Sequence, residues 1–247
     1  MRSITLFSLV SFVILSIVAY QVNAQTMSWQ AEKFTSTSGT ALQVLKPPFD
    51  TADVNNVAYK ITEASGGAFI GNPNNSGVPG LDGSWAKYDF TVPKAGDWFF
   101  WGRVIAPTGS DNSFFWMIDG ADADATASTT DTDKSNIWDF NEQNNCPLGP
   151  DCVFSTNWSW FRLSARAAGP FPVGPLGAGI DYADPIPLTL TAGKHTLYII
   201  SREDGAFLDK IFATMDKAFD ANKISPETAV EPQAKLTTTW GNLKQAH

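Results

Sequence analysis

The segment SREDGAFLDKIFAT, residues 201–214, raises the first chemical question. Its second half alternates like a β-strand, which would place Phe207, Asp209 and Ile211 on one face. If that apolar face is buried, the Asp209 carboxylate is buried with it. A buried charge without a partner costs too much free energy to be kept. The pattern therefore predicts that Asp209 contacts a lysine, an arginine or a metal ion.

Histidine, the commonest general base, is scarce in this chain. Only His195 and His247 are present, the first in a predicted strand and the second at the C-terminus. A Ser-His-Asp triad or a histidine metal site is therefore hard to assemble. Paired carboxylates for glycoside hydrolysis stay open because Asp and Glu are plentiful, but no pair stands apart in the sequence. The sequence favours a protein that is not an enzyme.

The N-terminus has the three parts of a secretory signal peptide. A basic MR start is followed by an apolar run over residues 4–19 and by the small-residue ending VNA at 22–24. A membrane anchor is the alternative, but serines interrupt the run and it is shorter than the roughly 20 residues that a span needs. We expect residues 1–24 to be removed and the mature protein to be secreted, without membrane insertion.

Composition narrows the class of partner. The chain has 25 acidic and 17 basic residues and a net charge of −8, which argues against nucleic acid or anionic membrane as a partner. Aromatic residues make up 13% of the chain, with nine Trp, so they form either core or an aromatic ligand surface. Cys146 and Cys152 enclose only PLGPD, and after export we expect them to form a local disulfide. A metal pair is the weaker alternative because no His lies nearby.

Strand patterns dominate the rest of the chain. SWAKYDFTV alternates, with Ala86, Tyr88 and Phe90 on one face, and DWFFWGRVIA is apolar at nearly every position, as in a central strand. Many short strands with hardly any helical periodicity predict an all-β, antiparallel two-sheet β-sandwich with adjacent first and last strands. We expect this sandwich over residues 25–216, long loops over 141–185 and a flexible tail over 217–247.

Three stretches in order resemble a known family. They are WQAEKF at 29–34, YDFTVPKAGDWFFWGRVIAPTGSDNSFFWMIDG at 88–120 and LTLTAGKHTLYIISREDGAFLDKI at 188–211. Together they resemble carbohydrate-binding modules of families 6 and 35 and related secreted domains of the galactose-binding-like fold. The resemblance implies a jelly-roll sandwich, sugar binding without catalysis and a structural calcium ion near the chain ends.

The resemblance offers a metal as the partner of Asp209. It implies calcium ligands at Gln30, Glu32 and Asp209, and calcium prefers such hard oxygens. Gln30 and Glu32 are two residues apart, so in a strand they project to the same side. The alternative is an ion pair of Asp209 with Lys33, Lys210 or an arginine. The acidic stretch at 119–133 lacks EF-hand spacing, and we expect a solvated loop there.

Sugar binding requires an aromatic ring against the apolar face of a pyranose and a few donors and acceptors for its hydroxyls. By its match to the family, Trp158 in STNWSWFRL is the expected platform. Trp160 either faces the same way or lies in the core, and Trp138 with Phe140 is the other aromatic pair. For the other tryptophans in dense apolar strands we expect core packing.

One position departs from the family pattern. The resemblance leads us to expect a sugar-contacting Asn two residues before the aspartate of the last strand, and this chain has Phe207 there. Arg202, Glu203 and Asp204 would then take the sugar hydroxyls, because an Arg fork beside a carboxylate suits a diol. A salt-bridged turn closed by Gly205 is the alternative.

The sequence thus predicts a secreted, non-catalytic protein that binds a polysaccharide or oligosaccharide through loop aromatics and holds a structural calcium ion. A secreted surface scaffold or adhesive protein without a defined sugar site is the alternative, and a polysaccharide-degrading enzyme is the less favoured one.

Overall fold

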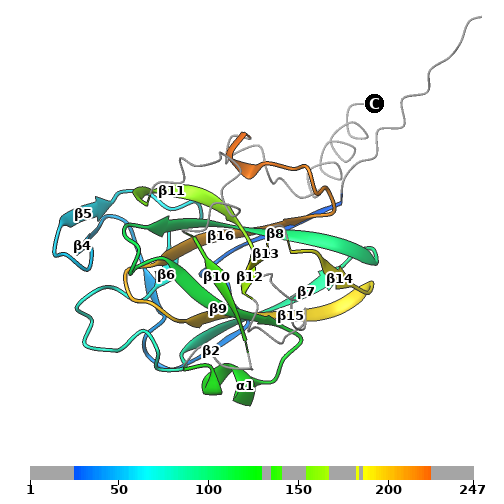
Figure 1. Ribbon diagram of the computed structural model, residues 1–247, viewed down its shortest axis with the longest axis horizontal. Helices are drawn as coiled ribbons and strands as arrows, with labels where there is room; N and C mark the ends of the chain where they lie inside the picture. Colours follow the sequence, from blue (N-terminus) through cyan, green and yellow to red (C-terminus); the bar gives the residue numbers. More distant parts are fainter. Residues whose placement is uncertain (1–24, 130–134, 141–153, 167–181, 184–185, 224–247) are drawn as a thin grey trace, which may run out of the picture.

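The computed structural model describes residues 25–129, 135–140, 154–166, 182–183 and 186–223. The predicted signal peptide and both cysteines, Cys146 and Cys152, lie outside these residues. The described chain is almost entirely β-structure, arranged as two antiparallel sheets that face each other (Figure 1). This confirms the predicted all-β sandwich. In the described part of the chain, no helix is long and apolar enough to cross a membrane.

One sheet has seven strands, in the order β11-β8-β16-β6-β3, with β1 on β16 and β14 on β8. Its members are β1 (Thr26–Gln30), β3 (Gln43–Leu45), β6 (Phe69–Gly71), β8 (Gly96–Ala106), β11 (Ser155–Arg162), β14 (Leu188–Leu190) and β16 (Phe207–Thr214). The first and last strands are adjacent, as predicted, since β1 pairs antiparallel with β16 from Thr26↔Thr214 to Gln30↔Lys210.

The other sheet has five strands, in the order β10-β9-β15-β7-β2. They are β2 (Ser36–Ser38), β7 (Trp85–Val92), β9 (Ser113–Ile118), β10 (Asn136–Asp139) and β15 (Gly193–Ser201). Two further hairpins pair β4 (Phe49–Ala52) with β5 (Ala58–Ile61) and β12 (Ala165–Arg166) with β13 (Tyr182–Ala183). In β7, Ala86 and Tyr88 point into the core between the sheets, while Asp89 is exposed, so the predicted alternation is confirmed.

The seven-stranded sheet is covered on both faces, which explains why β8 is apolar without alternation. Trp98 and Phe100 of β8 lie in the core between the sheets. Ile105 belongs to a cluster on the opposite face that includes Ile61 of the β4–β5 hairpin. Trp101 belongs to a further cluster with Trp160, Phe212 and Ala221. We call this opposite face the outer face of the sheet.

The C-terminal boundary of the packed structure lies beyond residue 216, which corrects the expected start of a flexible tail. Phe219 stacks on Phe212 with ring centroids 4.8 Å apart, and Ala221, in the short 3₁₀ helix η2 (Ala221–Lys223), is buried in the same cluster. Figure 1 shows this segment lying across the seven-stranded sheet.

The acidic stretch after β9 is not only a solvated loop. It forms the short helix α1 (Asp122–Ala127), with Asp122 and Asp124 in the first turn, where carboxylates are favourable. Ala125 is buried against the outer side of the five-stranded sheet, and Asp122 pairs with Lys87 at 3.1 Å. The expectation failed because the burial of one small alanine gives only a weak helical pattern in the sequence.

A β-bulge in β16 overturns the predicted faces of the opening segment. Leu208 pairs with Val104 and Lys210 with Arg103, so Asp209 is an extra residue in the ladder. The alternation slips by one position there. Ile211 therefore points into the core between the sheets, whereas Phe207 packs on the outer face, and the prediction that they share a face is wrong.

Close packing at Gly102 gives a first prediction. A Cβ at this position would overlap the buried ring of Trp138 and meet Leu208 Cδ1 at 2.8 Å. We expect Gly102→Ala to lower the free energy of unfolding by about 1–3 kcal/mol, the usual cost of overpacking a core. Gly109→Ala is the control, because its Cβ would meet Phe154 at an ordinary 3.5 Å. Urea denaturation measures both, and equal effects would contradict the packing at Gly102.

Candidate functional site

The buried carboxylate of Asp209 finds its partner on the neighbouring strand. Its Oδ2 lies 2.5 Å from Nη1 of Arg103, and its Oδ1 accepts a hydrogen bond from the Ser65 backbone N–H at 2.9 Å. The Asp209 side chain is fully buried and that of Arg103 is 9% exposed. Of the partners predicted for Asp209, the structure supplies an arginine.

Arg103 also reaches the surface through its second terminal nitrogen. Nη2 lies 2.9 Å from Oε1 of Glu63, whose side chain is 72% exposed. The guanidinium therefore bridges one buried and one exposed carboxylate. A planar fork of donors suits this role, which an ammonium could not fill with the same geometry.

Trp158 is packed against this ion-pair network. Its indole N–H donates to the Glu63 carbonyl oxygen at 2.7 Å, and Cζ of Arg103 lies 5.3 Å from the ring centroid. Phe69 contacts the ring in a T-shaped arrangement at 5.5 Å. These contacts hold the ring rigidly. Because it is only partly buried, it still reaches solvent.

A second irregularity brings Trp158 to this position. The register of β11 on β8 shifts between Ser155↔Ala106 and Ser159↔Val104, so β11 has extra residues opposite β8. Such bulges re-aim side chains and are frequent beside functional sites. Thr156 and Asn157, which precede Trp158 within the bulge, are exposed. The expected loop position of Trp158 is therefore an irregular part of a strand.

A hollow of about 180 Å³ opens beside Trp158, and we call it the Trp158 hollow. Its polar lining residues are Lys60, Thr62, Glu63, Arg103, Thr156 and Asn157. It combines an aromatic ring with hydroxyl, amide, carboxylate and ammonium groups. These are the groups that would bind a ring with an apolar face and hydroxyls around its edge.

The other predicted aromatic contacts are not available to a ligand. Trp138 is 1% exposed, and its indole N–H donates to the Arg162 carbonyl oxygen at 2.9 Å. Trp160 is 5% exposed and packs against Phe212 on the outer face. This corrects the expectation that Trp138 or Trp160 flanks the sugar, because sheet and segment packing covers both rings.

The turn before β16 is bound to its own scaffold. Nη1 of Arg202 lies 2.7 Å from Glu203 Oε1 and donates to the Ser113 hydroxyl at 2.5 Å. Glu203 also accepts the backbone N–H of Asn112 at 2.7 Å. Among the described residues that line the Trp158 hollow, none is Arg202, Glu203 or Asp204. This corrects their expected place beside Trp158 and matches the alternative of a salt-bridged turn.

Gly205 closes this turn with φ +82°, a conformation that favours glycine. Burial raises the pKa of the Asp204 carboxyl above its usual range, and the charge of Asp111 adds to the rise.

The residues expected to hold calcium do meet. Gln30 Oε1 accepts a hydrogen bond from the Ser65 hydroxyl at 2.6 Å, and the neighbouring Ser65 N–H binds Asp209. A Cβ on Gly66 would lie 2.5 Å from Glu32 Oε1 and 3.0 Å from Gln30 Cγ, so the loop around Gly66 packs tightly on both side chains. The residues therefore meet where the first strand, the loop over residues 62–67 and the last strand come together.

Glu32 is the least satisfied carboxylate in this group. Its side chain is 4% exposed, and within the described chain neither Oε1 nor Oε2 has a hydrogen-bond partner. The nearest cation is Lys33 Nζ at 3.7 Å. Burial raises the pKa of Glu32, and the Asp209 carboxylate adds to the rise. Two nearby carboxylates, one of them without donors, fit a hard cation.

Within the described ranges, no three His, Cys, Asp or Glu side chains lie close enough to hold a metal by themselves. A cation at Glu32 and Asp209 would therefore need Gln30 and backbone carbonyl oxygens to complete its shell. Calcium accepts such oxygens, whereas zinc prefers nitrogen and sulfur. The donor set fits calcium.

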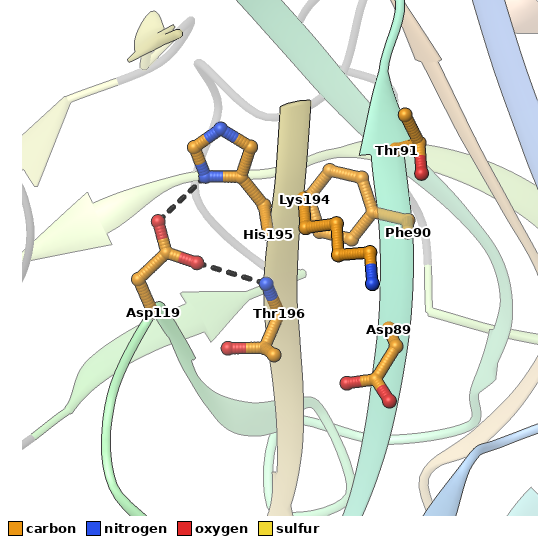
Figure 2. A pocket seen from close by; sticks show the side chains of 7 residues that line it. All are labelled: Asp89, Phe90, Thr91, Asp119, Lys194, His195 and Thr196. Atoms are coloured by element: carbon orange, nitrogen blue, oxygen red, sulfur yellow. Dashed lines mark hydrogen bonds and ion pairs between the residues drawn. The ribbon is translucent and has the colours of Figure 1, made fainter. Parts of the chain in front are cut away.

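Figure 2 shows a second, larger hollow of about 380 Å³ on the β7–β15 pair. It is lined by Asp89, Phe90, Thr91, Asp119, Lys194, His195 and Thr196. Asp119 lies between the His195 ring and the backbone of Thr196, with Oδ2 2.6 Å from His195 Nδ1 and Oδ1 2.8 Å from Thr196 N.

The His195 ring is held in place on both sides. Its other ring nitrogen, Nε2, lies 2.9 Å from the Thr191 carbonyl oxygen and 3.3 Å from the Thr191 hydroxyl. Both ring nitrogens therefore already face a partner within the protein, Asp119 on one side and Thr191 on the other.

Sequence reasoning missed Arg103, Glu63 and Lys60. A signal for Arg103 was present: it is the one charged residue within the apolar run FFWGRVIA. A guanidinium inside a central strand requires a carboxylate, just as Asp209 requires a cation. Pairing these two requirements would have predicted the contact. Glu63 and Lys60 carry no comparable signal.

No protein-family model matches this chain, and no curated protein matches it in sequence. One solved structure that is similar to this chain is the C-terminal family 6 carbohydrate-binding module of a marine laminarinase from Zobellia galactanivorans. The two are 14% identical with a TM-score of 0.36, and the match covers 77% of this chain and 99% of that chain. A family 6 module of Cellvibrio mixtus lichenase 5A, in complex with cellotriose, has 14% identity, a TM-score of 0.38 and coverages of 77% and 97%. A family 35 module from Clostridium thermocellum has 10% identity, a TM-score of 0.40 and coverages of 77% and 98%. Likenesses this distant do not assign a function.

The Arg103–Asp209 pair gives a second prediction. Arg103→Leu leaves a buried carboxylate uncompensated, and we expect it to lower the free energy of unfolding by about 3–5 kcal/mol. The double variant Arg103→Leu/Asp209→Leu should recover part of that loss, because it removes both charges. Lys60→Met, which breaks an exposed pair with Asp50, is the control and should cost less than about 1 kcal/mol.

Chemical denaturation of these four proteins and of the single variant Asp209→Leu measures these differences. A double variant that is less stable than Arg103→Leu by the full cost of losing Asp209 would show that the two residues do not interact.

Proposed function

We propose that this protein is a non-catalytic carbohydrate-binding protein and that the Trp158 hollow is its sugar site. The observation that carries the proposal is a partly exposed tryptophan fixed by its own N–H bond to Glu63 and by Arg103, directly beside exposed Thr156 and Asn157. A rigid ring stacks on the apolar face of a pyranose with little loss of side-chain entropy. The neighbouring polar groups then bind its hydroxyls.

The predicted signal peptide at residues 1–24 accords with this proposal, because a secreted protein meets polysaccharides outside the cell. The Cys146–Cys152 disulfide stays a prediction in the same setting. The small volume of the hollow favours one sugar ring, such as a chain end or a branch, over a long stretch of polysaccharide.

Substitutions at the Trp158 hollow test the proposal. On a glycan panel we expect Trp158→Ala to weaken binding by more than about tenfold, because the stacking surface is lost. Asn157→Ala should weaken it by about two- to tenfold, the effect of one hydrogen bond. Thr91→Ala, an exposed hydroxyl on the hollow of Figure 2, is the matched control and should bind as the wild type does.

Thermal melting in parallel separates lost binding from lost folding. Binding that survives Trp158→Ala but falls with Thr91→Ala would move the site to the β7–β15 hollow. A wild type that binds no glycan would refute the proposal and favour the scaffold alternative, and release of soluble products would favour an enzyme.

We also propose that a calcium ion lies at Gln30, Glu32 and Asp209, with backbone carbonyl oxygens completing its shell. The unsatisfied, buried carboxylate of Glu32 supports this proposal most directly. A cation there would offset the desolvation of Glu32 and tie the first strand to the last. Its role would be structural, since Arg103 separates it from the Trp158 hollow.

Calcium dependence of stability tests this site. With free calcium at a hundredfold excess over Kd, the bound ion adds about 2.7 kcal/mol to the free energy of unfolding. For a domain of this size, that raises the melting temperature by roughly 5–11 °C. Glu32→Gln should abolish this shift, and in chelator it should be no less stable than the wild type because it removes a buried charge. Glu63→Gln is the control and should keep the shift. Identical wild-type melting curves in calcium and in chelator would refute the site.

A further inference from the structure

The charges around the Trp158 hollow are already paired within the protein. The Lys60 ammonium lies 2.9 Å from Asp50 Oδ1. Arg103 places Nη1 on Asp209 and Nη2 on Glu63, so its fork of donors is occupied on both sides. An incoming anion would therefore compete with Asp50 for Lys60 and with Asp209 and Glu63 for Arg103.

Glu63 stands at the mouth of this arrangement. Its side chain is 72% exposed, and it blocks Nη2 of Arg103, whose own side chain is 9% exposed. Its backbone is fixed next to the tryptophan, because its carbonyl oxygen accepts the Trp158 indole N–H. A ligand that stacks on Trp158 therefore meets the Glu63 carboxylate at close range.

Lys210 adds one more charge near Arg103. It pairs with Arg103 in the β16–β8 register and is 7% exposed, but it is not one of the described residues that line the hollow. Burial lowers the pKa of Lys210, the Asp209 carboxylate acts against this, and the charge of Arg103 adds to the lowering. Lys210 therefore gives an anionic ligand no donor within the hollow.

We propose that Glu63 is a specificity-determining residue that restricts the Trp158 hollow to uncharged sugars and excludes uronates. The inference rests on the proposed sugar binding at this hollow. A uronate carboxylate would oppose the like charge of Glu63, and it would find Arg103 already engaged. A neutral hydroxyl can instead donate to the Glu63 carboxylate.

The same geometry predicts a switch. Glu63→Gln removes the opposing charge and weakens the hold on Nη2, which frees a buried arginine nitrogen for a ligand carboxylate. The Trp158 N–H bond runs to the Glu63 backbone, so the substitution leaves the tryptophan in place. An exposed Glu→Gln change should also leave the fold intact.

The experiment pairs each neutral cello-, manno- and galacto-oligosaccharide with the same oligosaccharide oxidised to the uronate at C6. For the wild type we expect the neutral form to bind at least about tenfold more tightly, which is about 1.4 kcal/mol. Glu63→Gln should reduce this preference to less than about threefold or reverse it. The wild-type preference should shrink at high salt, because salt screens a charge at the mouth.

Asp89→Asn removes the same unit of charge from an exposed site on the other sheet, and its preference should equal that of the wild type. An equal change in Asp89→Asn would overturn the role of Glu63 in favour of net charge. A wild type that binds uronates as well as neutral sugars would overturn the inference while leaving sugar binding intact. A wild type that binds neither form would overturn the proposed function as well.

Discussion

The buried pair between Arg103 and Asp209 is the interaction on which the outer face of the seven-stranded sheet depends. Its two charges come from adjacent strands, β8 and β16, and lie 2.5 Å apart with hardly any access to water. Neither charge could stay buried alone. The pair therefore fixes the loop of Ser65 on one side, through Asp209, and Glu63 and Trp158 on the other, through Arg103.

The sandwich was predictable because its strands follow simple burial rules. β7 alternates since one of its faces is solvated at Asp89, and β8 does not alternate since it is covered on both faces. The expectation of adjacent first and last strands rested on the strand spacing and on the need to bring Glu32 near Asp209. The faces of β16 could not be predicted, because a bulge is a property of two paired strands and leaves no alternation signal in one of them.

The candidate site was predicted only in part, for a related reason. Trp138, Trp158 and Trp160 look alike in the sequence, and what separates them is the cover that distant segments provide. Ala221 and Phe219 cover the outer face beside Trp160, while the sheet-to-sheet core encloses Trp138. Trp158 is left at a bulge between this cover and the β4–β5 hairpin. The sequence pattern around each tryptophan cannot show which distant segments of the chain will pack over it.

Both candidate sites lie at breaks in regular pairing, on the two strands that flank β8. Asp209 lies at the bulge in β16 and contacts Arg103, and Trp158 lies at the bulge in β11 beside the same guanidinium. Because Arg103 lies between the two irregularities, one side chain can hold the proposed metal position rigid and shape the charge of the proposed sugar site. Substituting it should therefore disturb both, whereas Glu63 acts on the sugar side alone.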